Sequence, residues 1–106
     1  MICGDTIAYL LKSQIPALKV SAAEQFAGLF IDLQEKAYHD EISSKSLDLR
    51  GLIGSIKTMQ RGLKPLRAIR IGITNKCFDV FEKELIEDTV GTRIPSEWTR
   101  ADIFAE

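Results

Sequence analysis

Apolar residues recur along most of the chain at the three- and four-residue spacing of an α-helix, and the alternation typical of a strand is nearly absent. Ser21 and Glu24 form a capping-box pattern, which predicts a helix from Ser21 to about Asp40. One buried stripe follows at Ala22, Phe26, Leu29, Phe30, Leu33 and Ala37. The predicted fold class is therefore all-α, a five-helix bundle with little or no β structure.

Four further helices are predicted from their end signals. The first covers residues 4–13, and the third starts at a cap on Asp48 and ends at Arg61, before a left-handed Gly62. A fourth starts at Pro65, whose missing N–H is not needed in a first turn. A fifth extends from Asp79 to about Thr92. The buried positions predicted for the last two helices are Leu66, Ile69, Ile73, Cys77, Phe81, Leu85, Ile86 and Val90.

The predicted domain organisation is one helical domain over residues 1–95 and a C-terminal tail over residues 96–106. The tail is short and polar, so we expect it to be only partly ordered. Trp98 within it either folds back on the helices or contacts another domain. Phe78 and the other phenylalanines on apolar stripes are expected in the core.

Composition narrows the class of protein. With 106 residues, 45% of them hydrophobic, the chain has the size and character of one soluble globular domain. Cys3 and Cys77 match no disulfide or zinc pattern, and neither a signal peptide nor a membrane span is evident, so we expect a cytoplasmic protein without membrane contact. The net charge of −1 argues against a protein that coats nucleic acid nonspecifically.

The charge is unevenly distributed along the chain. Residues 49–78 carry seven Lys or Arg and no Asp or Glu, while both flanking segments are acidic. Arg50 opens the third predicted helix, where the positive end of the helix dipole disfavours a cation, and Gly51 and Gly54 stand beside it. A bound phosphate would resolve this conflict, because backbone amides and a guanidinium both attract it. The simpler interpretation is a solvated arginine and glycines that allow close helix packing.

Motifs of a self-sufficient enzyme are missing from the sequence. It contains no P-loop and no G-x-G-x-x-G turn, and no nucleophile, acid–base or metal-ligand constellation, so we predict neither catalytic residues nor metal ligands. His39 lacks companions and is expected at the surface or at a helix end. If the anion is a nucleotide, most of its binding site lies on another domain.

Three features together resemble the C-terminal lid of AAA+ ATPases, with the MoxR and NirQ/CbbQ-like, dynein-related group the most similar. They are Arg50 just inside the third helix, the stretch G-L-K-P-L-R-A at residues 62–68, and E-L-I-E-D-T-V-G-T-R-I-P at residues 84–95. The similarity covers most of residues 5–95. Asp48 stands where members of this group often have Ser or Thr, so Arg61 is a second candidate for the position of Arg50.

The resemblance implies a function for this arginine. In that group the sensor 2 arginine of the lid contacts the γ-phosphate of ATP, and this role is carried over to Arg50, with Gly51 and Gly54 beside it. It also implies an ATPase core before Met1 that holds ATP and Mg²⁺ through Walker motifs. The implied partners are that core, neighbouring subunits of a hexameric ring, and a client protein that is remodelled.

The alternative is an autonomous helical interaction module that binds protein or nucleic acid through its basic helix face. Nucleic acid is the less favoured partner, because the helix opens with Leu49, Arg50, Gly51 and Leu52, which are poor in groups that read bases.

Overall fold

The computed structural model describes residues 4–39, 49–72, 80–95 and 97–105. These residues form an all-α fold with six helices: α1 (Gly4–Gln14), α2 (Val20–Tyr38), α3 (Leu49–Gln60), α4 (Pro65–Gly72), α5 (Val80–Arg93) and α6 (Arg100–Ile103). The prediction of an all-α protein is confirmed. The last helix was not predicted.

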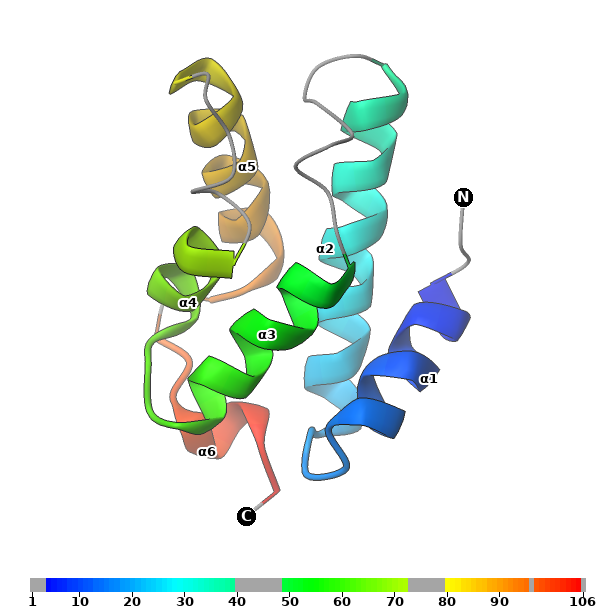
Figure 1. Ribbon diagram of the computed structural model, residues 1–106, viewed down its shortest axis with the longest axis vertical. Coiled ribbons are helices and arrows are strands. Elements are labelled where there is room, and N and C mark those ends of the chain that lie inside the picture. Colours follow the sequence, from blue (N-terminus) through cyan, green and yellow to red (C-terminus); the bar gives the residue numbers. More distant parts are fainter. Residues whose placement is uncertain (1–3, 40–48, 73–79, 96, 106) are drawn as a thin grey trace.

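The helices pack in pairs around α2. Figure 1 shows α1 beside α2, α5 standing roughly alongside α2, α3 running diagonally from in front of α2 toward α6, and α6 beneath α3 and α4. Helix α1 packs along α2, α3 along α4, and α5 against α2. The predicted stripe of α2 is buried in this core, apart from the half-buried Ala37, and Leu52, Ile56 and Met59 of α3 are buried with it.

The start of α2 differs from the prediction. The N-cap is Lys19, which has no side-chain cap, and Ser21 lies inside the helix, so the predicted Ser21 capping box is wrong. Lys19 is held extended because its N–H donates to the carbonyl of Ile103 at 2.9 Å, while its own carbonyl accepts from Ala23 at 2.8 Å. A contact distant in sequence therefore sets this helix end, where local propensity alone would favour Ser21.

The segment after Pro95 packs against the body of the fold. Thr99 and Asp102 form a capping box at the start of α6, and Ile103 and Phe104 are buried. Phe104 forms an isolated antiparallel bridge with Leu18, and the N–H of Ala105 donates to the carbonyl of Ala17 at 2.7 Å. These contacts hold the linker between α1 and α2 against the C-terminal segment.

Trp98 folds back onto the helices, one of the two predicted alternatives. Its ring meets Phe26 of α2 edge to face, with centroids 6.4 Å apart. The Trp98 side chain is half-buried.

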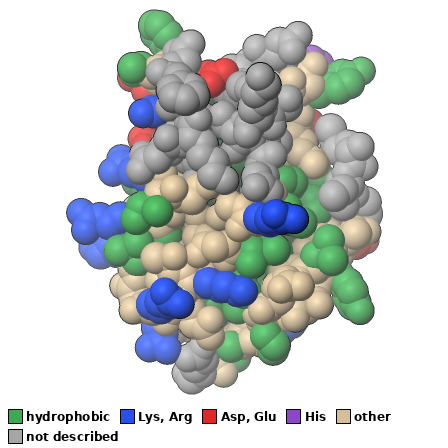
Figure 2. All heavy atoms as spheres, in the orientation of Figure 1, with side chains coloured by type: hydrophobic (Ala, Val, Ile, Leu, Met, Phe, Trp, Pro, Cys, Tyr) green, Lys and Arg blue, Asp and Glu red, His purple; other side chains and the backbone are tan. Residues whose placement is uncertain are grey.

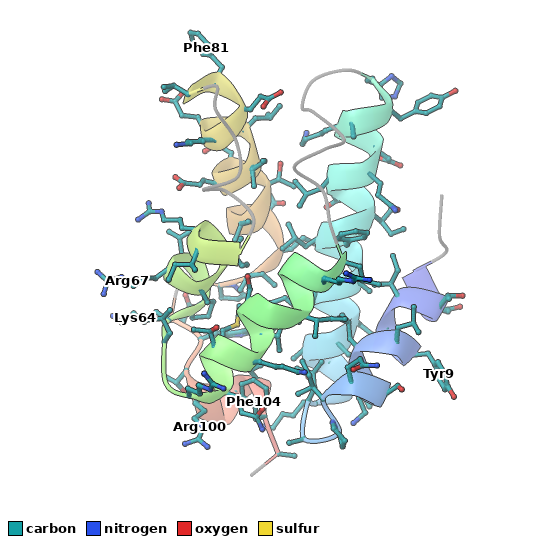
Figure 3. All side chains as sticks on the ribbon, viewed as in Figure 1. Tyr9, Lys64, Arg67, Phe81, Arg100 and Phe104 are labelled. Atoms are coloured by element: carbon teal, nitrogen blue, oxygen red, sulfur yellow. The ribbon has the colours of Figure 1, made fainter. Side chains whose placement is uncertain are left out.

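Some predicted core positions are corrected or lie outside the described residues. Phe81 was expected in the core but is 81% exposed. The buried stripe of α5 passes through Ile86 and Val90, and Phe81 lies in the first turn, pointing away from the body (Figure 3). The expectations for Asp40, Asp48, Ile73, Cys77, Phe78 and Asp79, and for Cys3, fall outside the described residues.

Two end signals read from the sequence are confirmed. Gly62 has φ 111°, the left-handed conformation expected after α3. Pro65 is the first residue of α4. His39 is exposed at the C-cap of α2, as predicted.

Candidate functional site

Arg50 is the second residue of α3, and its side chain is exposed. The first turn of a helix has amides that no carbonyl of the same helix accepts, and it carries a partial positive charge. Arg50 therefore adds a full positive charge to a helix end that already attracts anions. This is the placement expected from the sequence.

A groove of about 380 Å³ lies beside Arg50, between α3 and α4. Gly51, Gly54, Ser55 and Thr58 line it from α3, and three residues line it from α4: Ala68, Ile71 and Gly72. Arg50, Gly51 and Gly54 of the predicted site thus share one groove. The residues from α4 could not be paired with them from the sequence.

The close backbone approach in this groove occurs between the two helices. A Cβ atom on Gly72 would overlap Ser55 Oγ and lie 2.6 Å from the carbonyl oxygen of Gly51. The glycine that this tight crossing requires is therefore Gly72, which packs against the backbone of α3 at Gly51. Gly54 differs, because a Cβ there would meet no atom within 4 Å, and its backbone is open to the groove.

The groove contains a hydroxyl group with unsatisfied hydrogen-bonding capacity. Ser55 is only 2% exposed, and its Oγ has no hydrogen-bond partner in the described part of the chain. Thr58, one turn away, donates its Oγ1 to the carbonyl of Gly54 at 2.9 Å. Buried hydroxyls are usually hydrogen-bonded, but this Oγ is packed against Gly72 of α4 and has almost no accessible surface, so it is not offered to a ligand in the groove.

Arg61, the second candidate, lies elsewhere. It follows the last residue of α3 and is exposed, and its backbone N–H donates to the carbonyl of Thr58 at 3.1 Å. Eleven residues of helix span roughly 16 Å, so Arg50 and Arg61 lie at opposite ends of α3. One phosphate cannot contact both, and the groove lining includes Arg50 alone of the two.

The remaining cations of α3 and α4 form a basic surface. Figure 2 shows Lys and Arg side chains gathered over these two helices. We call the exposed residues Lys57, Arg61, Lys64 and Arg67 the basic surface; they have no carboxylate partner among the described residues.

Arg70 is excluded from this surface by its contacts. Its Nε and Nη2 donate to the Glu87 carboxylate of α5 at 2.7 and 3.4 Å. This pairing raises the pKa of Arg70, through the hydrogen bond first and the Glu87 charge second. The charge of Arg70 is thus balanced within the chain.

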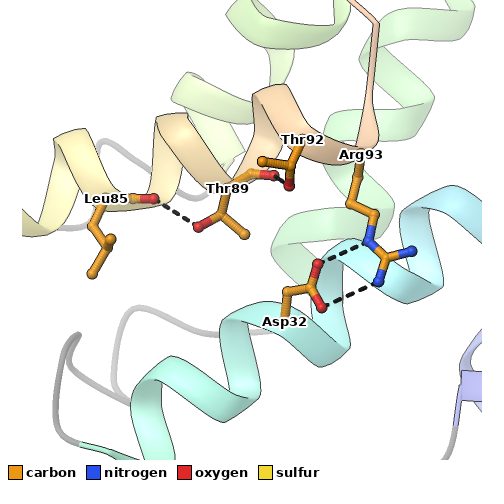
Figure 4. Close-up of polar contacts among 5 residues, drawn as sticks. All are labelled: Asp32, Leu85, Thr89, Thr92 and Arg93. Carbon is orange, nitrogen blue, oxygen red and sulfur yellow. Dashed lines mark hydrogen bonds and ion pairs between the residues drawn. The ribbon is translucent and has the colours of Figure 1, made fainter.

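A second ion pair ties α5 to α2. The Arg93 Nε and Nη2 donate to Asp32 at 2.8 and 3.3 Å (Figure 4), and the guanidinium lies over Gly28, where a Cβ would be 2.8 Å from Nη1. The pairing with Asp32 raises the pKa of Arg93. Sequence reasoning missed this contact, because its members are 61 residues apart and follow no local pattern.

Comparisons of the chain with family models, with curated proteins and with solved structures found no match.

The geometry of the Arg50 groove offers an anion two kinds of donor. They are the guanidinium of Arg50 and the helix end that carries it. The described residues contain no group of three or more His, Cys, Asp or Glu placed to hold a metal ion. None of the described helices combines the length and the apolar character required to cross a bilayer.

Proposed function

We propose that this chain is the helical lid of a MoxR-like AAA+ ATPase and that Arg50 contacts the terminal phosphate of ATP. The observation that carries the proposal is the exposed Arg50 in the first turn of α3, at the mouth of an open groove. A phosphate there would be favoured by the helix dipole and by paired guanidinium hydrogen bonds. The resemblance at residues 62–68 and 84–95 supports the same assignment.

The energetics favour a shared nucleotide site over a self-contained one. A hydrogen bond to a charged group contributes about 1.5–3 kcal/mol, whereas a millimolar dissociation constant corresponds to about 4.1 kcal/mol. Arg50 and a helix end alone would bind ATP no better than in the millimolar range. The proposal therefore includes an ATPase core that precedes Met1 in a longer parent protein and holds Mg²⁺ and most of the nucleotide.

Under this proposal, the lid couples ATP hydrolysis to movement. A ligand shifts a conformational equilibrium only through contacts that differ between the two states. Arg50 would make such a contact with the γ-phosphate and lose it after hydrolysis, so that the lid rotates as a rigid body. The movement would act on a client protein through a hexameric ring in the cytoplasm.

The test is Arg50→Ala in the full-length parent protein. We expect the rate of ATP hydrolysis to fall roughly ten- to hundredfold, the range that corresponds to one charged hydrogen bond. Arg67→Ala, which removes an exposed cation of α4 outside the groove, is the matched control and should retain activity. Wild-type turnover and ATP-dependent assembly in Arg50→Ala, with a loss in Arg61→Ala instead, would move the role to Arg61. Full activity in both variants, or a parent without a P-loop, would refute the proposal.

A second candidate function is an autonomous interaction module. The basic surface favours it, because its cations have no carboxylate partner in the described part of the chain. If its ligand were DNA, affinity should fall steeply with added salt. Binding of DNA by the isolated chain, with no effect of Arg50→Ala on any ATPase, would favour this function over the lid.

A further inference from the structure

A second groove lies at the other end of α3 from Arg50. It has a volume of about 280 Å³ and separates the turn between α3 and α4 from the segment around α6. Its wall is largely apolar, from Met59, Leu63, Pro65, Trp98 and Ile103. A groove of this size accommodates one large side chain, but it is too small for the row of apolar side chains along one face of a helix.

Positive charge surrounds the opening of this groove. Lys64 and Arg100 line it, and Figure 3 shows Lys64, Arg67 and Arg100 along the same edge of the molecule. Arg61 precedes Gly62, which is part of the lining. Glu97 is the single carboxylate among the described lining residues, so the rim is positive overall.

Lys64 and Arg67 differ from Arg70 in their ionic contacts within the described residues. Lys64 and Arg67 are exposed and have no ionic partner among the described residues, whereas Arg70 is paired with Glu87. An apolar groove with a positive rim is complementary to an apolar side chain flanked by carboxylates.

We infer that this groove binds an extended acidic peptide segment through one large apolar side chain, with Lys64 and the neighbouring cations contacting the flanking carboxylates. Trp98, which is half-buried on Phe26, would form one wall around the anchor. The inference is independent of the nucleotide proposal, because Arg50 does not line this groove.

A peptide fits these features better than a nucleic acid does. Sequence-tolerant binding of single strands relies on aromatic faces on which bases stack, and Trp98 is the one aromatic residue in the described lining. The aliphatic wall offers bases few hydrogen-bonding groups, and Glu97 would repel a phosphate backbone. An oligonucleotide is therefore an outcome that would refute the inference.

The experiment uses Trp98, the single tryptophan of the chain, as a fluorescent reporter. The probe is a nine-residue peptide with a central phenylalanine flanked on each side by glutamates, titrated into the purified chain at low salt. We expect saturable binding that changes Trp98 emission and weakens as salt is added. Replacing the phenylalanine by alanine tests the anchor, and replacing the glutamates by glutamine tests the charge; each change should weaken binding.

Charge variants test the residues. Because each exposed ion pair contributes little, Lys64→Glu should weaken peptide binding about threefold, and Arg61→Glu combined with Lys64→Glu should weaken it roughly tenfold. Arg70→Gln is the matched control, since its guanidinium is occupied by Glu87, and it should bind like wild type.

Several results would overturn the inference. One is no binding of the peptide at millimolar concentration. Another is that the alanine or glutamine peptide binds as tightly as the original peptide, or that the double variant binds the original peptide as tightly as wild type does. A third is that a single-stranded DNA oligonucleotide binds more tightly than the peptide. Arg50→Ala should leave peptide affinity unchanged, so failure of the lid proposal and failure of this inference give different results.

Discussion

Replacing Gly72 by alanine tests the helix crossing that forms the Arg50 groove. The added methyl group would overlap Ser55 Oγ and lie 2.6 Å from the carbonyl oxygen of Gly51. The serine can rotate, but the carbonyl belongs to the backbone of α3 and moves only with the helix. The substitution therefore requires α3 and α4 to separate.

The expected change in the free energy of unfolding of Gly72→Ala follows from two opposing effects. Overpacking costs typically about 1–3 kcal/mol, whereas exchanging glycine for alanine inside a helix gains at most about 1 kcal/mol. Gly72 is the last residue of α4, so this gain is at the low end. We expect Gly72→Ala to lower the free energy of unfolding by about 1–2 kcal/mol, which corresponds to a Tm several degrees lower.

The matched control is Gly54→Ala in α3. A Cβ there would meet no atom within 4 Å, so the propensity gain is unopposed, and stability should rise by up to about 1 kcal/mol. Urea unfolding followed by far-ultraviolet circular dichroism measures both variants. The tight crossing between Gly72 and the carbonyl of Gly51 would be refuted if Gly72→Ala proved as stable as wild type. It would also be refuted if both substitutions raised the free energy of unfolding.

Two further predictions concern the C-terminal segment. Phe104→Ala removes a side chain that is 1% exposed, and it should lower the free energy of unfolding by about 3–5 kcal/mol, as measured by urea unfolding. The control is Ala101→Ser, at an exposed position. Unchanged stability of Phe104→Ala would place Phe104 outside the core. Hydrogen bonds from the backbone N–H and the hydroxyl of Thr99 lower the pKa of Asp102. The stabilising contribution of Asp102 is therefore complete above the ordinary carboxyl pKa of about 3.9. It is lost as the pH falls through the lowered pKa. Asp102→Asn should therefore be less stable than wild type near neutral pH, and the difference should become smaller in acid. Thermal unfolding between about pH 7 and pH 2 measures this difference. Parallel curves of Tm against pH for the two proteins would contradict this role of Asp102.

The helices were predictable because their signals are local. The stripe of α2, Gly62 after α3 and Pro65 at the start of α4 follow from spacing and backbone preference alone. Helix α6 also had a local signal, since Thr99 and Asp102 have capping-box spacing before the apolar pair Ile103–Phe104, but the polar composition of the tail concealed it.

The remaining features depend on contacts between distant residues. The start of α2 is set by Ile103, and the packing around Gly51 is set by Gly72. Spacing along α3 could place Arg50 near two glycines, but it could not show that α4 forms the opposite wall or that Ser55 is buried against Gly72. Whether Arg50 contacts ATP remains a proposal for the full-length protein to test.

The backbone pairing of residues 103–105 with residues 17–19 has a consequence for biosynthesis. While the chain is still being translated, α1 and α2 can form, but Ala17 and Lys19 lack these backbone partners until residues 103–105 have left the ribosome. We therefore expect the native state to be completed only after residue 105 has emerged from the exit tunnel. Nascent chains stalled before that point should be digested readily by proteases between α1 and α2.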